Sequence, residues 1–340
     1  MEPGKELDTA KMYRVAADKF ILNITFAWEH AVAITDNNDA GKLVSHRFPQ
    51  FSFNPKLKPH FFKYLMLDKK FREHLELSSP GGAGRNRVLK ISDMLKYEIK
   101  LPSIEEQIKI GKYFDNLDHL ITLHQRKCEQ TKKLKKYMLQ KMFPQNGAKV
   151  PEIRFDGFTY DWEQRKLGDV CSRVQGNDGR MKLPTLTISA GNGWMRQEDR
   201  FSGNIAGNEQ KNYTLLHTGE LSYNHGNSKL AKYGAVFSLR NYEEALVPRV
   251  YHSFRVEEGC ADYIEYYFAT KLPDRELRKL ISSGARMDGL LNIGYDEFMG
   301  IKMMFPSIKE QNEIATYFRS LDHLITLHQR QHKLHLNALL

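Results

Sequence analysis

The chain has 340 residues, 41% hydrophobic and 27% charged, which is an ordinary globular balance with room for about two domains. No apolar run reaches the roughly 20 residues that span a bilayer, and three scattered cysteines exclude a disulfide framework. The net charge of +10 favours polyanionic partners such as nucleic acid, although simple solubility explains it equally well. The polar N-terminal segment lacks a secretory apolar region, so we expect a cytoplasmic protein.

The first predicted domain spans residues 1–100 and contains one loop with DNA-binding character. The string SPGGAGRNRVLK places Arg85, Arg87 and Lys90 on a glycine-rich segment. Glycines let the backbone approach a phosphate closely, and arginine can fork onto a phosphate or a guanine edge. The string lacks the Lys-Ser/Thr ending of a nucleotide-binding P-loop. These three residues are therefore candidate DNA contacts.

Residues 101–147 are predicted to form one long helix. Ser103 can accept hydrogen bonds from the free N–H groups of the first turn, and Glu105 and Glu106 suit the positive end of the helix dipole. The apolar positions recur at four-three spacing, which is the pattern of a coiled-coil seam. The seam residues are Leu117, Ile121, His124 and Cys128.

The second predicted domain spans residues 148–304 and has three polar segments that could contact DNA. The string SYNHGNSKLAKYGAVF follows a strand-like segment and is typical of a hairpin with a polar loop. An ordinary polar loop is the alternative interpretation for each residue. The candidates are Asn192 and Arg196 in SAGNGWMRQEDR, Asn224, His225, Asn227, Ser228, Lys229 and Lys232 in the hairpin, and Arg286 and Asn292 in SGARMDGLLN.

Residues 305–340 are predicted to form a second long helix that repeats the first. The string LDHLITLHQR occurs at 117–126 and again at 321–330, and the alignment extends without a gap from Leu101 and Phe305. We expect the two helices to bury their apolar stripes against each other and to run antiparallel, as a rigid spacer. Two separate surface helices, each docked on its own domain, are the alternative. The second seam consists of Leu321, Ile325, His328 and His332.

The repeat predicts an α+β protein with two mixed α/β domains, joined by long antiparallel coiled-coil helices and related by a pseudo-two-fold repeat. The helices are nearly identical, which indicates two equivalent contacts, whereas the bodies have diverged and can read different things. Residues 151–212 precede Tyr213, but only twelve residues precede the matching Tyr13. We therefore expect the first domain to be shortened at its front.

Two variable bodies, each followed by a near-identical [LF]PSI-EQ…YF…LDHLITLHQR helix, resemble the specificity (S) subunit of type I restriction–modification enzymes. The string FDGFTYDWEQRKLGDV at 155–170 is similar to the opening of a target-recognition domain in that family. The resemblance covers nearly the whole chain from Tyr13. It implies that each domain reads one half of a split DNA site in the major groove and that the helices set the gap between the half-sites.

The resemblance also implies the partners of this chain. An S subunit has no active site of its own and binds no cofactor. It docks two methyltransferase (M) subunits, which modify adenine at N6. ATP-dependent restriction (R) subunits join the assembly. S-adenosylmethionine, ATP and Mg are thus expected on the partner subunits. Self-association of this chain through its helices remains open, and no membrane partner is expected.

Other kinds of chemistry are weakly supported. No methyltransferase motif is present, and Glu98–Lys100 imitates the carboxylate-x-Lys string of a nuclease on what is predicted to be a short strand, but the repeat keeps no carboxylate there. His328 and His332 could share a metal, yet the usual third and fourth ligands are missing, so we predict no metal site. A truncated scaffold or decoy that holds M subunits without reading both half-sites is the main functional alternative.

Overall fold

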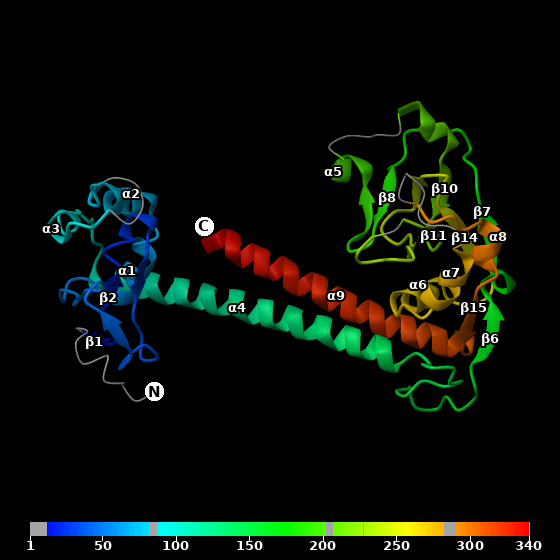
Figure 1. Cartoon of the computed structure of the whole chain (residues 1–340), viewed down its shortest axis with the longest axis horizontal. Coiled ribbons are helices and arrows are strands. Elements are labelled where there is room, and N and C mark those ends of the chain that lie inside the picture. The colour runs from blue at the N-terminus through cyan, green and yellow to red at the C-terminus, as the bar shows by residue number, and fades with distance from the viewer. Residues whose placement is uncertain (1–11, 82–86, 202–206, 227, 282–289, 340) are drawn as a thin grey trace. The chain divides into compact units, whose positions relative to one another are not determined.

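The computed structural model describes residues 12–81, 87–201, 207–226, 228–281 and 290–339 (Figure 1). These residues divide into two compact units. The first comprises the described chain up to Arg126 together with the part from Gln329 onward, and the second is Lys127–His328. The long helices α4 (Ile104–Lys141) and α9 (Ile308–Leu339) therefore contribute to both units.

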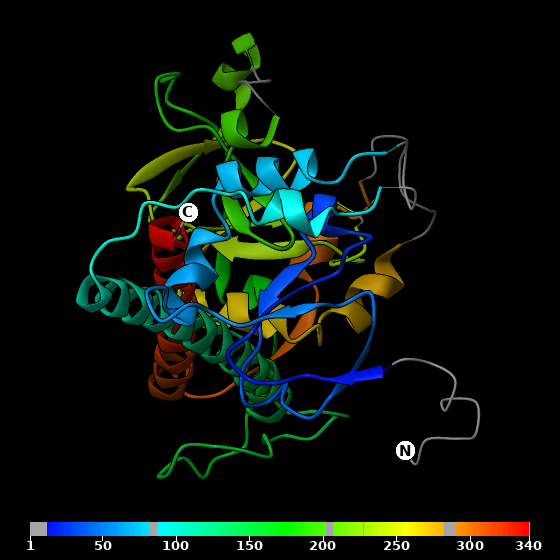
Figure 2. The same ribbon diagram turned by 90° about the vertical axis from the view of Figure 1, so that its left-hand side faces the viewer.

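The first unit is built on two small antiparallel sheets. In one sheet β2 lies between β3 and β5, and in the other β1 pairs with β4. Phe20 and Leu22 of β2 pack with Phe62, Phe71 and Leu75 from the helices to form the core. Figure 2 turns these strands and helices, drawn in blue, toward the viewer. The elements are β1 (Met12–Arg14), β2 (Phe20–Leu22), β3 (Val32–Ile34), β4 (Leu43–Ser45), β5 (Gln50–Phe51), α1 (Pro59–Leu65), α2 (Lys69–Leu77) and α3 (Ile91–Met94), with a short 3-10 turn, η2, at Ala27–Glu29.

The second unit contains a four-stranded antiparallel sheet in the order β12-β11-β14-β7, with the pairs β8-β9, β10-β13 and β6-β15 beside it. Its strands are β6 (Glu163–Lys166), β7 (Cys171–Val174), β8 (Leu186–Ser189), β9 (Gly193–Arg196), β10 (Thr214–His217), β11 (Leu221–Asn224), β12 (Ala235–Ser238), β13 (Glu244–Val247), β14 (His252–Val256) and β15 (Lys302–Phe305). Its helices are α5 (Gln197–Phe201), α6 (Ala261–Ala269), α7 (Asp274–Leu280) and α8 (Tyr295–Met299), and its 3-10 turns are η4 (Leu167–Asp169) and η5 (Gly207–Asn212).

The core of the second unit is aromatic and includes the ends of both long helices. Phe143 follows α4 and Phe318 lies on α9, and both are fully buried together with Tyr263 of α6. The predicted hairpin is confirmed, because β11 and β12 pair with Tyr223 opposite Val236. The aromatic segments around Phe62 and Tyr263 belong to the buried cores of the first and second units respectively.

Both long helices begin as the sequence predicts. The Glu106 backbone N–H donates to the Ser103 hydroxyl at 3.2 Å, and the Glu310 N–H donates to the Ser307 hydroxyl at 3.3 Å. Each hydroxyl satisfies one N–H group that has no partner within the helix. The two copies of the repeat therefore open with the same N-cap.

The helices pair antiparallel, and the contacts within each unit establish this. In the first unit the rings of His124 and His335 stack with centroids 5.5 Å apart. In the second unit the Cys128 sulfur lies 4.0 Å from the Ile325 carbonyl oxygen, and Lys135 forms an ion pair with Asp322 at 2.5 Å. The contacting residues increase in number along α4 while their partners on α9 decrease in number, which is the order of an antiparallel pair. The fold class is confirmed, and the alternative of two separate surface helices is wrong.

The predicted seam positions follow one stripe on each helix. Leu117, Cys128 and Leu321 are buried. The other members are half-buried: Ile121, His124, Ile325, His328 and His332. Leu324 and Leu327 of α9 lie between these positions and are exposed, so the seam is narrower than the whole apolar surface of that helix.

Three observations limit other interpretations. The strand expected at Glu98–Lys100 is absent, since these residues have no partner strand within the described chain. The part of the chain that the structure describes holds no group of three side chains suited to a metal ion, so His328 and His332 gain no further ligand there. No described helix combines the length and apolar character needed to cross a bilayer.

Candidate nucleic-acid interface

Asn224 ties the end of β11 to the end of β8. Its Nδ2 donates to the Ile188 carbonyl oxygen at 3.2 Å, and its Oδ1 accepts from the Gly226 N–H at 3.0 Å. Both donor and acceptor sides of the amide are thereby engaged by backbone. The side chain holds the β8–β9 turn and the loop after β11 next to each other.

The segment at residues 290–292 packs against the loop after β11 through the backbone of His225 and Gly226. The Leu291 N–H donates to the His225 carbonyl at 2.8 Å, and Gly226 forms an antiparallel bridge with Leu290. This contact brings Asn292, which is exposed, beside the hairpin loop. The sequence could not show this, because the two segments lie far apart in the chain.

The His225 side chain is a core element. It is 6% exposed, and its Nδ1 and Nε2 lie 2.7 Å and 2.8 Å from the carbonyl oxygens of Leu291 and Val250. Its ring stacks on His252 at 4.9 Å, and burial lowers the pKa of His252 to about 4. Because both His225 nitrogens already face backbone, its role is to support the loops, and it is a poor candidate for a base contact.

The loop at 228–232 presents two lysines on a closed turn. Ser228 and Ala231 exchange backbone hydrogen bonds at 3.2 Å, and the Ser228 hydroxyl accepts from the Ala231 N–H at 3.1 Å. Lys229 and Lys232 are exposed, and neither forms an ion pair with any residue that the structure describes. Two unneutralised ammonium groups on a fixed turn suit phosphate oxygens.

A cavity of about 430 Å³ lies among these loops. On its wall the Tyr251 hydroxyl accepts from the Ile188 N–H at 3.3 Å, and Arg200 donates to the Ile188 carbonyl at 2.7 Å. Arg200 was missed from the sequence; it follows β9 on α5, and only the folded chain brings it to the end of β8. The lining residues are Thr187, Ile188, Ala190, Arg200, Phe201, Asn224, Gly226, Ser228, Ala231, Ala235, Pro248, Val250, Tyr251 and Leu290.

The β8–β9 hairpin separates two of the predicted residues. Asn192 is exposed in the turn, close to the 228–232 loop, since a Cβ on Gly191 would lie 3.2 Å from Leu230. Arg196 lies at the opposite end of the hairpin, where it pairs with Leu186 in the sheet register. Asn192 therefore belongs to the loop cluster and Arg196 does not.

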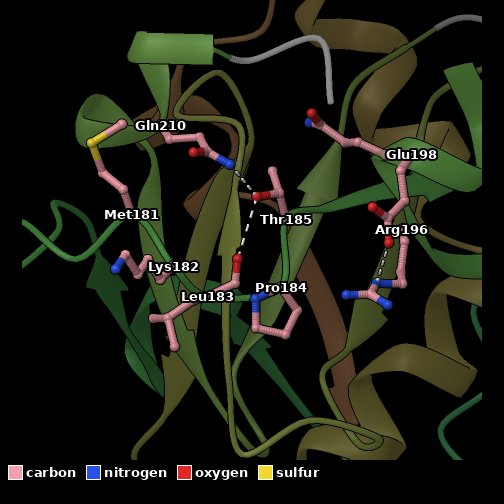
Figure 3. A pocket seen from close by; sticks show the side chains of 9 residues that line it. Met181, Lys182, Leu183, Pro184, Thr185, Arg196, Glu198 and Gln210 are labelled. Carbon is pink, nitrogen blue, oxygen red and sulfur yellow. Dashed lines mark hydrogen bonds and ion pairs between the residues drawn. The ribbon is translucent and has the colours of Figure 1, made fainter. Parts of the chain in front are cut away.

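Arg196 borders a second cavity of about 270 Å³, shown in Figure 3. Its Nε forms an ion pair with Glu198 at 3.0 Å, and in this view Lys182 lies on the other side of Pro184 and Thr185. Gln210 donates to the Thr185 hydroxyl at 2.6 Å and closes one wall. A phosphate could compete with Glu198 for Arg196, because the ion pair is exposed and therefore weak.

In the first unit, Arg87 is held by its own domain. It donates to the carbonyl oxygens of Ser79 and Glu76 at 3.1 Å each, and its guanidinium lies 5.1 Å from the Trp28 ring centroid. Lys90 is exposed at the start of α3. Arg85, Asn227 and Arg286 lie outside the described residues.

Six of the predicted DNA contacts thus meet at one place in the second unit, which we name the loop cluster. It consists of Asn192, Asn224, Ser228, Lys229, Lys232 and Asn292. Asn192 and Asn292 are exposed amides of the kind that contact base edges, and the exposed lysines suit phosphates, whereas the Asn224 amide is engaged by backbone and holds the loops together.

Comparison with known proteins identifies the architecture. The family described as "Type I restriction modification DNA specificity domain" matches residues 5–133 and 160–338. The S subunit of the type I restriction–modification system from M. genitalium aligns with a TM-score of 0.57 and 13% identity, over 98% of this chain and 82% of its own. At that identity the likeness concerns the fold alone.

A second solved structure is more distant in shape. The HsdS subunit from Thermoanaerobacter tengcongensis aligns with a TM-score of 0.46 and 16% identity, over 96% of this chain and 80% of its own. No curated protein matches the chain by sequence.

Proposed function

The chain belongs to the family of type I restriction–modification DNA specificity domains, and we propose that it is the sequence-reading subunit of such a complex. In this proposal it carries no catalytic residues. It reads a bipartite DNA site and recruits M and R subunits, which bind S-adenosylmethionine, ATP and Mg. It works in the cytoplasm, where it meets DNA.

The observation that carries DNA reading is the convergence of three separate segments in the loop cluster. The turn of β8–β9, the loop after β11 and the segment at 290–292 are joined by Asn224 and by the backbone of His225. Loops fixed on a rigid sheet can hold amide groups in one geometry against base edges, while Lys229 and Lys232 supply sequence-independent affinity.

The repeat supports two equivalent docking sites for M subunits. The string LDHLITLHQR is identical at seam positions and also at positions that face solvent in both helices. Packing between α4 and α9 does not require identity at exposed positions, so an external partner that meets each copy in the same way explains it. The exposed identical pairs are His119 and His323, Thr122 and Thr326, Gln125 and Gln329, and Arg126 and Arg330.

The helix pair supports a spacer role. Its interior contacts, including the His124–His335 stack and the Lys135–Asp322 ion pair, fix α9 against α4. B-DNA turns once in about 10–10.5 base pairs, so a stiff spacer sets both the distance and the rotational phase of two half-sites. In the proposal α4 and α9 set this gap.

The experiment is a gel-shift selection of the chain with its M subunit from a library of random duplexes. Enrichment of two half-sites separated by a fixed gap is the expected result. Enrichment of one half-site alone would mean that the first unit, which we predict to be shortened, does not read DNA. M binding without any enriched sequence would contradict DNA reading and support the scaffold or decoy.

A further inference from the structure

The two repeats differ in one ion pair at the start of the long helix. In the second unit Glu310 is 1% exposed and receives both arms of Arg154, with Nε–Oε1 at 2.8 Å and Nη2–Oε2 at 2.9 Å. The matching residue in the first repeat, 204 positions earlier, is Glu106. Glu106 is exposed and has no cationic partner in the described part of the first unit. The same carboxylate is therefore buried and paired in one repeat and open in the other.

An aromatic pair lies about two turns further along each helix, and its tyrosine shows the same difference. In the second unit Tyr317 and Phe318 contact each other at 5.4 Å, and both are covered, Tyr317 by Phe155 at 6.1 Å and Phe318 by Phe143 at 6.0 Å. In the first unit the matching pair, Tyr113 and Phe114, keeps the same mutual contact at 5.5 Å. Tyr113 is nevertheless 57% exposed. Phe114 is covered by the Tyr64 ring at 4.7 Å, so among the described residues only Tyr113 lacks the cover that its counterpart Tyr317 has.

The segment that precedes each long helix also differs between the two units. In the second unit β15 pairs antiparallel with β6, from Lys302 opposite Lys166 to Phe305 opposite Glu163. The matching residues of the first repeat, 98–101, are not paired with any strand in the described chain. Leu101 is 42% exposed, whereas its counterpart Phe305 is 4% exposed. An unpaired backbone edge beside exposed apolar side chains is a site where an extended peptide can add a strand.

We propose that this open face of the first unit, formed by residues 98–101 with Glu106 and Tyr113, binds an extended segment of a partner polypeptide. The segment adds a strand to residues 98–101, places an arginine on Glu106 and covers Tyr113 with an aromatic ring. Residues 153–166 of this chain show the required chemistry, since they perform each of these tasks in the second unit. They are already engaged there in each copy of this chain, so the proposed occupant of the first unit is a different protein with a similar Ile-Arg-Phe and strand pattern.

The test uses a fluorescently labelled synthetic peptide with the sequence of residues 150–170 and the full chain, without DNA, followed by anisotropy. The expected result is saturable binding that Glu106→Lys weakens at least tenfold. Glu105→Lys is the matched control, because it makes the same charge change one position away on the exposed first turn; its counterpart Lys309 forms no ion pair among the described residues of the second unit. The control is expected to change the affinity less than twofold.

A charge exchange separates this site from nonspecific adhesion. A peptide carrying glutamate in place of its arginine is expected to lose binding to the wild-type chain and to regain it with Glu106→Lys. Absence of peptide binding would overturn the proposal, and so would binding that is indifferent to Glu106, because the peptide would then be entering the second unit. Concentration-dependent self-association that Glu106→Lys abolishes would assign the face to a second copy and also overturn it. Since no DNA is present, these outcomes are independent of DNA reading.

Discussion

The two units attach their bodies to the long helices in the same way although their body sequences have diverged. Gln107 donates to the Pro102 carbonyl at 3.0 Å and accepts from the Lys58 N–H at 2.9 Å. Gln311 donates to the Pro306 carbonyl at 2.9 Å and accepts from the Cys260 N–H at 3.0 Å. Lys58 and Cys260 are the N-cap residues of α1 and α6. One glutamine thus links the start of each long helix to the N-terminus of a helix in its body, α1 in the first unit and α6 in the second.

A tyrosine repeats the link about three turns further along each long helix. The Tyr64 hydroxyl donates to Asp118 at 2.8 Å, and the Tyr266 hydroxyl donates to Asp322 at 2.8 Å. The lysine that pairs with each aspartate comes from a different place in the two units. Lys63, next to Tyr64, pairs with Asp118, whereas Lys135 of α4 pairs with Asp322 of α9. The two repeats therefore share the hydrogen bonds that attach each domain to its long helix, while the rest of the domain sequence differs.

The largest expected effect concerns the Arg154–Glu310 ion pair, which has no counterpart among the described residues of the first unit. Arg154→Ala leaves Glu310 buried without its cation, and removal of one partner of a buried pair costs about 3–5 kcal/mol. We expect the free energy of unfolding, from urea denaturation, to fall by that amount. Glu106→Ala, the matched change in the first unit, should alter it by less than about 0.5 kcal/mol. Equal effects of the two variants would remove the distinction between the units.

The shared glutamines are expected to matter equally in both units. Gln107→Ala and Gln311→Ala each leave a backbone donor and acceptor, mostly only partly buried, without their side-chain partner, which costs about 1–3 kcal/mol. Hydrogen exchange of the first turns of α1 and α6 reports each loss locally. If amide exchange became faster in only one of the two variants, the two glutamines would not attach their helices equivalently.

Acid is expected to weaken the second unit through His252. Burial lowers its folded pKa from 6.5 to about 4, so the unfolded chain binds a proton at a higher pH than the folded chain does. Stability from this group is present above pH 6.5 and is lost as the pH falls from 6.5 toward 4, by on the order of 1–3 kcal/mol. Denaturation curves across this range measure the loss. His252→Gln should flatten it, and an unchanged slope in that variant would contradict the assignment.

The loop cluster is expected to give the smallest energetic effect, seen in DNA binding. The double variant Lys229→Ala, Lys232→Ala should weaken binding about tenfold and reduce the salt slope of the association constant by about 2. Fluorescence anisotropy at several salt concentrations measures both quantities. Lys166→Ala, an exposed lysine on β6, serves as the control and should leave the slope unchanged. An equal loss in the control would indicate nonspecific attraction only.

Much of the fold could be predicted from the sequence because the repeat serves as an internal comparison. Four-three spacing with caps at Ser103 and Ser307 predicts both helices, and their seam predicts the pairing that the structure confirms. The strand at Glu98–Lys100 was predicted wrongly, because strand formation depends on a partner that propensity does not reveal.

The candidate site was only partly predictable. The hairpin pattern correctly predicted the loop that carries Lys229 and Lys232. The sequence could not show that His225 faces the core, because a histidine beside a polar loop gives the same local pattern when it faces solvent. Arg200 and the ion pair between Arg154 and Glu310 join residues distant in the chain, so no local pattern announces them. Long-range contacts of this kind follow from the tertiary fold.

The central proposal is that the chain reads a bipartite DNA site and that α4 and α9 set the gap between its half-sites. The most direct test takes the bipartite site selected with the M subunit and inserts or deletes one or two base pairs in its gap. Each base pair changes the separation by about 3.4 Å and the phase by roughly one tenth of a turn, so affinity is predicted to fall at least tenfold for either change. Affinity that is unchanged across the series would contradict the account.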